Sequence, residues 1–178
     1  LAAAVASLAR LKWSLSSGLH WNAKLVEAAV TTSARGIDVL DWGLKSGRLL
    51  PYRAQIGYNP EGKLYAWASA SGLVATLVWA RKKNFPWDYV TQGACLSVAA
   101  RRGHLHVMQW VRENATEKAS RKDCYRKVCE YAAAGGHLAV VRWARAQGYY
   151  WHNTAAAAAR GNHLELLQWA RANGCPWD

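Results

Sequence analysis

Hydrophobic residues recur along this chain in short stretches that share one pattern. If the first apolar residue of each stretch is counted as zero, apolar side chains fall at offsets 0, 2, 3, 5 and 6, whereas offsets 1, 4 and 8 are mostly polar. In an α-helix, at about 100° per residue, this apolar set covers more than half of the circumference. The pattern predicts short helices that are covered on several sides, as they would be between the helices of adjacent repeats.

Each stretch carries a tryptophan at offset 5, which we call the first tryptophan, and four of the six copies carry a second one eight residues later. The first tryptophans are Trp13, Trp42, Trp79, Trp110, Trp143 and Trp169. The second tryptophans are Trp21, Trp87, Trp151 and Trp177. Leu50 holds the second position in copy two, and copy four has lost the second tryptophan. The copies cover approximately residues 1–22, 23–50, 64–88, 92–115, 124–152 and 153–178, with insertions at 51–63 and 116–123.

The positions of the ten tryptophans predict a structural role for all of them. They keep register with the apolar stripe, so we assign them to the core, and base stacking by exposed indoles is the alternative. The second tryptophan is expected to fold back and seal the end of its own helix. Asp88 and Asp178 follow two of these tryptophans, where a carboxylate can cap the next helix.

An alanine-rich run precedes each tryptophan stretch in the later copies, as in "CLSVAARRG", "VCEYAAAGG" and "TAAAAARGN". The run ends in a glycine or asparagine, which can adopt the left-handed conformation that terminates a helix. Each copy therefore reads as two short helices joined by a tight turn. One such pair buries too little to fold alone, so several pairs must share a core.

The segments "AARRGHLHVMQW", "AAAGGHLAVVRW" and "AAARGNHLELLQW" resemble the signature that joins the two helices of ankyrin repeats. The chain is similar to the tryptophan-rich ankyrin variant with a W-x7-W-D ending, which is typical of protist and large-virus proteins. The resemblance covers nearly the whole chain and is best from Cys95 onward. It implies an all-α, ankyrin-like α-solenoid of helix-turn-helix repeats over residues 1–178, with the first copy degraded or incomplete.

Two departures from the family pattern change this expectation. The T-P-L-H motif of the first ankyrin helix is missing from every copy, and successive first tryptophans lie 26 to 37 residues apart, against about 33 in standard ankyrin repeats. The shortest copy leaves little room for a β-hairpin finger. We therefore expect the fingers to be short or absent.

The composition predicts a folded, basic, intracellular protein. The chain has 178 residues, of which 52% are hydrophobic and 19% charged, and its net charge is +12. An anionic partner would suit this charge, although simple solubility is an equal explanation. The four cysteines form no CxxC pair, which favours reduced thiols and argues against secretion. The uncharged run from Leu64 to Ala80 is interpreted as two helices joined at Gly72, not as a transmembrane span.

Basic residues supply the candidate binding sites. An arginine follows the first tryptophan by two residues in four copies: Arg81, Arg112, Arg145 and Arg171. They could lie along apolar surface with a cation–π contact to the second tryptophan, or form an anion-binding column. A second candidate patch combines the insertion with the preceding turn: Arg101, Arg102, Lys118, Arg121, Lys122, Arg126 and Lys127. A solvated charged loop is the alternative for this patch.

No motif for catalysis or for cofactor binding occurs: P-loop, GxSxG, HExxH and GxGxxG are all missing from the sequence. His104 and His106, near Cys95, could be imagined as metal ligands, but His104 recurs in the repeat frame as His137 and His163, which favours a structural role. We predict no catalytic residue, no metal, no cofactor and no small-molecule substrate.

The family resemblance implies a non-enzymatic interaction or scaffold module, which we expect to dock in a larger assembly through its basic surface. Its partners would be other protein subunits, with an anionic membrane surface as a further possibility. The alternative is an RNA-contacting structural subunit, for example of an organellar ribosome.

Overall fold

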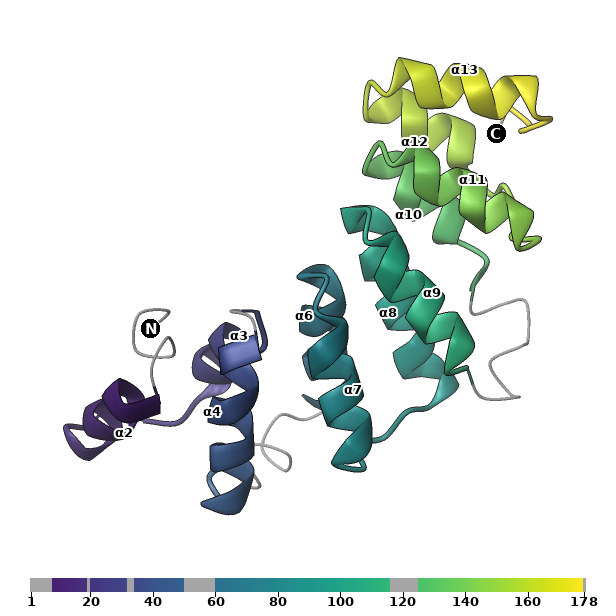
Figure 1. The fold of residues 1–178 in the computed structure, drawn as a ribbon. Helices are drawn as coiled ribbons and strands as arrows, with labels where there is room; N and C mark the ends of the chain where they lie inside the picture. The colour runs from purple at the N-terminus through teal and green to yellow at the C-terminus, as the bar shows by residue number, and fades with distance from the viewer. Residues whose placement is uncertain (1–7, 19, 32–33, 50–59, 116–124, 178) are drawn as a thin grey trace. The chain divides into compact units, whose positions relative to one another are not determined.

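A computed structural model describes residues 8–18, 20–31, 34–49, 60–115 and 125–177, and its regular elements are α-helices throughout these ranges (Figure 1). The all-α class is therefore confirmed. The helices are α2 (Leu8–Ser16), α3 (Ala23–Thr31), α4 (Ala34–Lys45), α6 (Pro60–Ala70), α7 (Val74–Lys82), α8 (Tyr89–Arg102), α9 (Leu105–Glu113), α10 (Val128–Ala134), α11 (Leu138–Ala146), α12 (Thr154–Arg160) and α13 (Leu164–Ala172). The predictions for Leu50, Lys118, Arg121, Lys122 and Asp178 lie outside the described residues, as do residues 51–59 and 116–123 of the two insertions.

From α6 onward the helices form hairpins that turn at a residue in the left-handed conformation. The φ angle is +72° at Gly72, +77° at Gly103 and +75° at Gly136. Asn162 takes this place between α12 and α13, with φ at +57°. The predicted turn chemistry is thus confirmed in these four copies, including the division of the uncharged run into α6 and α7. Among the described helices, none combines the length and the hydropathy that crossing a bilayer would require.

Two helices begin earlier than the sequence predicted. The first is α6, which starts at Pro60, inside the expected insertion; proline suits the first turn because the N–H that it lacks would have no intrahelical acceptor. The second is α8, which starts at Tyr89 because Asp88 caps it: the Asp88 carboxylate accepts a hydrogen bond of 2.8 Å from the backbone N–H of Thr91. The capping role predicted for Asp88 is confirmed.

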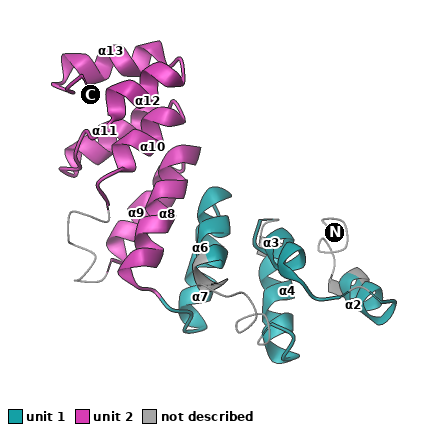
Figure 2. Ribbon diagram, turned by 180° about the vertical axis from the view of Figure 1, so that it is seen from behind, with its two compact units in different colours: residues 1–86 teal, residues 87–178 magenta. Residues whose placement is uncertain are grey.

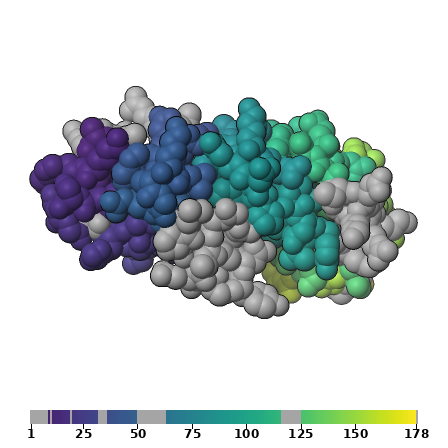
Figure 3. All heavy atoms as spheres, turned by 90° about the horizontal axis from the view of Figure 1, so that it is seen from below, coloured from purple at the N-terminus to yellow at the C-terminus, as the bar shows by residue number. Residues whose placement is uncertain are grey.

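The chain divides into two compact units, residues 1–86 and residues 87–178, which Figure 2 shows in separate colours. In unit 1, α3 packs against α4 and α6, α6 packs against α7, and α4 contacts α7. Buried Leu25, Val30, Leu40 and Leu77 form part of its core. Figure 3 shows in space-filling form how side chains close the gaps that the ribbons leave between these helices. The expectation of one repeat domain over residues 1–178 stays a prediction.

In unit 2 the alanine-rich helices lie side by side. Helix α10 contacts α8 on one side and α12 on the other, and each tryptophan-bearing helix packs on its own partner, α9 on α8, α11 on α10 and α13 on α12. The alanine-rich helices thus hold the position between the helices of adjacent copies. The prediction that the tryptophan-bearing helices hold this position was wrong. Methyl groups such as those of Ala132 and Ala133 let helices approach more closely than indoles do.

The buried stripe of the tryptophan-bearing helices is narrower than predicted. In α9 the buried residues are Val107, Met108 and Val111, at offsets 2, 3 and 6. Offset 5, where the first tryptophan stands, lies about 100° around the helix from the centre of that stripe. The indole therefore lies at the edge of the core, where a neighbouring helix pair can reach it.

Candidate functional site

The second tryptophan packs forward onto the first tryptophan of the next copy. The ring centroids are 6.0 Å apart for Trp21 and Trp42, and 5.9 Å apart for Trp151 and Trp169. Each pair joins the loop after one tryptophan-bearing helix to the next such helix. The prediction that this residue packs on the end of its own helix holds only in part. Trp151 and Trp177 do contact Arg145 and Arg171 in the last turn of the helix before them. The forward contact was not predicted, and it arises because the following helix offers an indole face and free carbonyl groups.

Trp87 shows the complete form of this contact. Its ring lies 5.5 Å from that of Trp110, and its indole N–H donates a hydrogen bond of 2.8 Å to the backbone carbonyl of Asn114, which caps the C-terminus of α9. The indole thereby covers an aromatic face and satisfies one of the free carbonyls at the helix end. Because both needs are met, Trp87 is only 7% exposed.

The assignment of all ten tryptophans to the core was wrong in part. Trp79 and Trp87 are buried as predicted, at 7% exposure each, whereas Trp13 is 71% and Trp177 is 68% exposed. The others are half-buried: Trp21, Trp42, Trp110, Trp143, Trp151 and Trp169. The second tryptophans Trp21, Trp87 and Trp151 each pack on the first tryptophan of the following copy.

The copies that precede copies three and five have no second tryptophan. In copies three and five an aromatic residue of the same copy packs on the first tryptophan instead. Phe85 lies six residues after Trp79 and packs on it at a centroid distance of 5.6 Å. Tyr149 lies six residues after Trp143 and packs on it at 5.9 Å. Copies two, four and six, which do receive a second tryptophan, have Arg48, Thr116 and Cys175 at that position. In copies two to six, therefore, an aromatic side chain packs on the first tryptophan, and it comes either from the preceding copy or from the same copy.

The arginines of the repeat frame divide into two kinds. The Arg145 guanidinium lies 4.4 Å from the ring centre of Trp151 and donates to the carbonyl of Tyr149. Arg171 repeats this arrangement with Trp177 and Cys175. The predicted cation–π contact is therefore confirmed for these two arginines. Their guanidinium groups are already engaged at the helix end, which disfavours the anion-binding column for them.

The other two arginines differ. Arg112 lies 5.8 Å from the ring centre of Tyr149 and donates a hydrogen bond of 3.4 Å to its hydroxyl group. Arg81 belongs to unit 1 and is exposed. In the second candidate patch, Arg101, Arg102, Arg126 and Lys127 are all exposed, as a charged surface requires.

The histidines of the helix-helix turns pack on glycines. A Cβ atom added to Gly103 would lie 2.6 Å from Nδ1 of His137, and one added to Gly136 would lie 2.5 Å from Cε1 of His163. The Nε2 atom of His137 also lies 3.1 Å from the carbonyl oxygen of Arg101. These contacts confirm the structural role predicted for His137 and His163. Within the ranges that the structure describes, no three metal-ligating side chains come together.

Burial perturbs one thiol and one phenol of unit 2, those of Cys129 and Tyr149. Cys95, Cys129 and Cys175 are buried. Burial raises the pKa of Cys129 to about 12, so this thiol stays protonated at neutral pH. Burial likewise raises the pKa of Tyr149, although the hydrogen bond from Arg112 opposes the effect.

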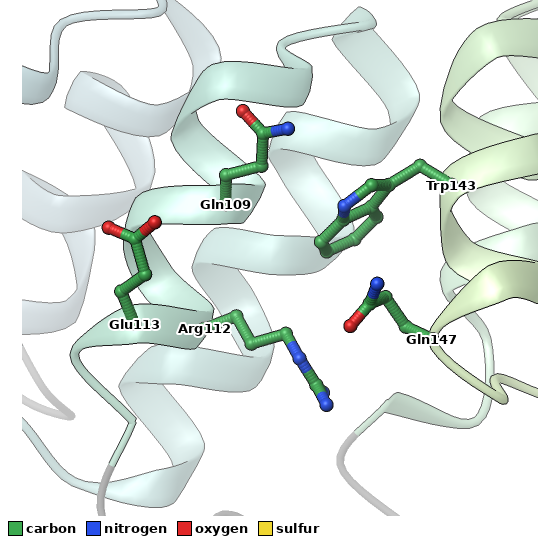
Figure 4. Close-up of a pocket in the computed structure, with 5 residues that line it drawn as sticks. All are labelled: Gln109, Arg112, Glu113, Trp143 and Gln147. Atoms are coloured by element: carbon green, nitrogen blue, oxygen red, sulfur yellow. The ribbon is translucent and has the colours of Figure 1, made fainter.

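An open pocket of about 470 Å³ lies between α9 and α11 (Figure 4). Its lining, which we call the α9–α11 pocket, consists of Gln109, Arg112, Glu113, Trp143 and Gln147. In the close-up the Trp143 indole points from α11 toward α9, and the Arg112 side chain runs across the opening toward Gln147. The pocket thus combines an aromatic face, a cation, a carboxylate and amide groups.

Of the five lining residues, sequence reasoning singled out only Arg112 and Trp143. One signal could have found the pocket. It lies at the junction after copy four, whose second position is occupied by lysine at residue 118 instead of tryptophan. At this junction Tyr149 packs on Trp143 where a second tryptophan would otherwise do so.

No protein-family model matches the sequence, and a search of curated proteins finds no match either.

Proposed function

We propose that this chain is a non-enzymatic interaction module, built as an ankyrin-like α-solenoid, which docks in a larger assembly as an accessory subunit. The observation that carries the proposal is the repetition of one set of contacts at successive helix pairs. Left-handed turn residues, histidine–glycine contacts and arginine–indole contacts recur where the repeat frame places them. Repeat arrays of this kind bind partners over an extended surface.

The charge of the surface supports an anionic partner. Arg101, Arg102, Arg126 and Lys127 are exposed in unit 2, and the whole chain carries a net charge of +12. Exposed cations steer association with acidic proteins and give specificity more than affinity. An acidic protein subunit is the partner class that we favour.

Cross-linking mass spectrometry in native extract tests this function. We expect cross-links from Lys127 and the neighbouring lysines to acidic segments of one or two recurrent protein partners. Recovery of the chain without a recurrent protein partner would contradict the proposal.

The salt dependence of binding tests the alternative, an RNA-contacting subunit. Binding to a single-stranded RNA through about five cations would give a slope near −0.7 per neutralised phosphate in a plot of log K against log salt. A slope of that size, together with RNA that co-purifies, would replace the protein partner by RNA.

A further inference from the structure

We infer that one edge of unit 2 binds an extended acidic segment of a partner protein, in which two carboxylates stand about five or six residues apart. The edge consists of the turns within the hairpins α8–α9, α10–α11 and α12–α13, at residues 101–104, 134–137 and 160–163, and we call it the turn edge (Figure 1). The inference rests on the proposed function, because it names the kind of segment that the acidic partner would present.

The three turns form one continuous surface, because each contacts the next. A Cβ atom added to Gly135 would lie 2.3 Å from the carbonyl oxygen of Arg101, and one added to Gly136 would lie 2.5 Å from Cε1 of His163. Helix α10 also packs against α8 on one side and against α12 on the other. An extended segment that crosses the turn edge therefore meets the three hairpins in succession.

Arginines stand at the two outer turns, and the middle turn has none. Arg101 and Arg160 hold the same repeat position, three residues before the histidine of their turn, and Arg102 adds a second cation beside Arg101. All three arginines are exposed. The corresponding residue of the middle turn is Ala134, which is exposed as well. The turn edge therefore has two cationic ends around a centre without arginine or lysine.

The centre of the turn edge is also low. Gly135 has an ordinary helical backbone with φ at −89°, so its missing side chain is explained by the close contact with the preceding turn and not by its conformation. The His137 ring is engaged with that same turn, since its Nε2 atom lies 3.1 Å from the carbonyl oxygen of Arg101. A crossing segment can thus lie against Ala134 and Gly135 without meeting a bulky side chain.

The spacing of the helices sets the spacing of the carboxylates. Packed helices lie about 8–10 Å apart, so Arg101 and Arg160, which are two helices apart, are separated by about 16–20 Å. An extended chain advances by about 3.3 Å per residue. Carboxylates about five or six residues apart therefore reach both arginines, and each guanidinium can hold a carboxylate through two hydrogen bonds.

Two acidic residues of the described part of unit 2 lie close to these turns in the sequence. The carboxylate of Glu130 lies 2.9 Å from Nδ1 of His152 and is mostly buried. Glu165 is exposed in the first turn of α13 and opposes an acidic ligand beside Arg160. Three exposed arginines against this one exposed carboxylate leave the turn edge cationic.

The composition of the turn edge favours a protein segment over single-stranded RNA. Proteins hold single strands by stacking the bases on aromatic side chains, but residues 99–106, 132–139 and 158–165 include no tryptophan, tyrosine or phenylalanine. An RNA strand also carries a charge at every nucleotide, whereas the turn edge has arginines only at its two ends. Carboxylates at a single spacing match this distribution better.

Two capped peptides of the same composition test the spacing on the full 178-residue chain: Glu-Glu-Ser-Gly-Ser-Gly-Glu and Glu-Glu-Glu-Ser-Gly-Ser-Gly. The protein is labelled with nitrogen-15, and the backbone N–H signals of Gly135 and Gly136 report binding. The first peptide should shift both signals saturably, and the second should bind at least about threefold more weakly. Equal binding would overturn the spacing, and unshifted signals would overturn the site.

A matched pair of variants locates the ligand. Ala134 and Ala146 are the exposed last residues of α10 and α11, and they lie at opposite ends of the same hairpin. Ala134→Glu should weaken binding of the first peptide by at least about threefold, because it places a like charge at the centre of the turn edge, whereas Ala146→Glu should leave it nearly unchanged. Equal weakening would overturn the inference, since both variants have the same net charge.

Removal of the opposing carboxylate should increase the affinity. Glu165→Gln should strengthen binding of the first peptide by about twofold. An unchanged affinity would overturn the placement of the ligand beside Arg160.

Two further results separate this inference from its alternatives. A short oligouridylate that displaces the first peptide and binds the turn edge more tightly would replace the acidic protein segment by RNA. If neither peptide binds while cross-linking in native extract recovers a recurrent protein partner, the inference fails and the proposed function stands. Peptide binding at the turn edge without a recurrent partner would support the inference and contradict the proposed function alone.

Discussion

Helices α4 and α7 of unit 1 meet through the same repeat positions as α9 and α11 of unit 2, yet the first junction is closed and the second is open. Asp41, one residue before its first tryptophan, corresponds to Gln109; Lys83, four residues after the next first tryptophan, corresponds to Gln147. Trp79 and Trp143 are themselves equivalent. The difference must therefore come from side-chain chemistry.

Charge closes the junction in unit 1. The Asp41 carboxylate accepts a hydrogen bond of 2.9 Å from the indole N–H of Trp79 and pairs with the Lys83 ammonium at 2.7 Å. We call these three residues the α4–α7 clamp. The hydrogen bond from Lys83, followed by that from Trp79, lowers the pKa of Asp41 to about 2.

The glutamines at the equivalent positions in unit 2 make no such contact among the described residues. Gln109 and Gln147 carry no charge, and Arg112, which lines the same pocket, contacts Tyr149. One substitution pattern therefore converts a buried structural indole into the wall of an open pocket. The comparison teaches that the repeat frame sets where tryptophans stand, while the residues around them decide whether an indole is buried or lines an open pocket.

The largest expected effect is a difference in the free energy of unfolding between alanine variants of Trp79 and Trp143. Trp79→Ala should lower the free energy of unfolding by about 3–5 kcal/mol, because it empties a buried and hydrogen-bonded site. Trp143→Ala should cost about half of that, since its indole faces the open pocket. Urea denaturation followed by circular dichroism measures both, and equal losses would refute the comparison.

Breaking the α4–α7 clamp should have the next largest effect on the free energy of unfolding. Asp41→Asn should lower the free energy of unfolding by about 1–2 kcal/mol at pH 7, because it removes a charge-assisted acceptor that is partly exposed to solvent. Asp38→Asn, on the exposed side of the same helix, is the control and should have little effect.

The same clamp predicts a pH dependence. Because the pKa of Asp41 falls from 3.8 to about 2 on folding, its contribution is complete above a pH of about 4 and is lost as the pH falls toward 2. The wild-type chain should therefore lose more stability over this interval than Asp41→Asn does. Denaturation curves at several pH values measure the difference, and parallel profiles would count against the clamp.

The arginine that stacks on an indole and the arginine that contacts the Tyr149 phenol should also differ. Arg145→Lys should cost about 1 kcal/mol, because lysine cannot both stack on Trp151 and donate to the Tyr149 carbonyl. Arg112→Lys should cost only a few tenths of a kcal/mol. Thermal unfolding compares the pair, and a larger loss for Arg112→Lys would reverse the interpretation.

The smallest expected change in stability comes from a variant that tests directly whether charge closes such a junction. The double variant Gln109→Asp and Gln147→Lys moves the α4–α7 clamp to α9–α11, and it should stabilise the chain by about 0.5–1 kcal/mol. A double-mutant cycle isolates the coupling between the new charges, and zero coupling would show that other residues keep the junction open.

The local features of the fold could be predicted from the sequence. It placed the hairpin turns at Gly72, Gly103, Gly136 and Asn162, and it gave Asp88 its capping role, because these properties depend on residues within one or two turns of the chain. It also predicted the cation–π contacts of Arg145 and Arg171. Each of those arginines lies six residues before its tryptophan, so the contact remains local.

The contacts between copies could not be predicted from the sequence. The sequence shows that Trp151 stands eight residues after Trp143, but not that its ring lies on Trp169 of the following copy. Periodicity gives the angle of a side chain on its helix, and it does not give the neighbour at that angle. The same gap explains why Gln109 and Gln147 were not recognised as lining residues.

By itself, the sequence determined the alternation of alanine-rich and tryptophan-bearing helices, their turns and their basic charge, since backbone propensity and helical periodicity act over a few residues. Tertiary structure alone decided which helices contact their neighbours, which indoles are covered and where a pocket stays open. These outcomes depend on the distance between helix pairs, which is set by the bulk and charge of side chains far apart in the sequence.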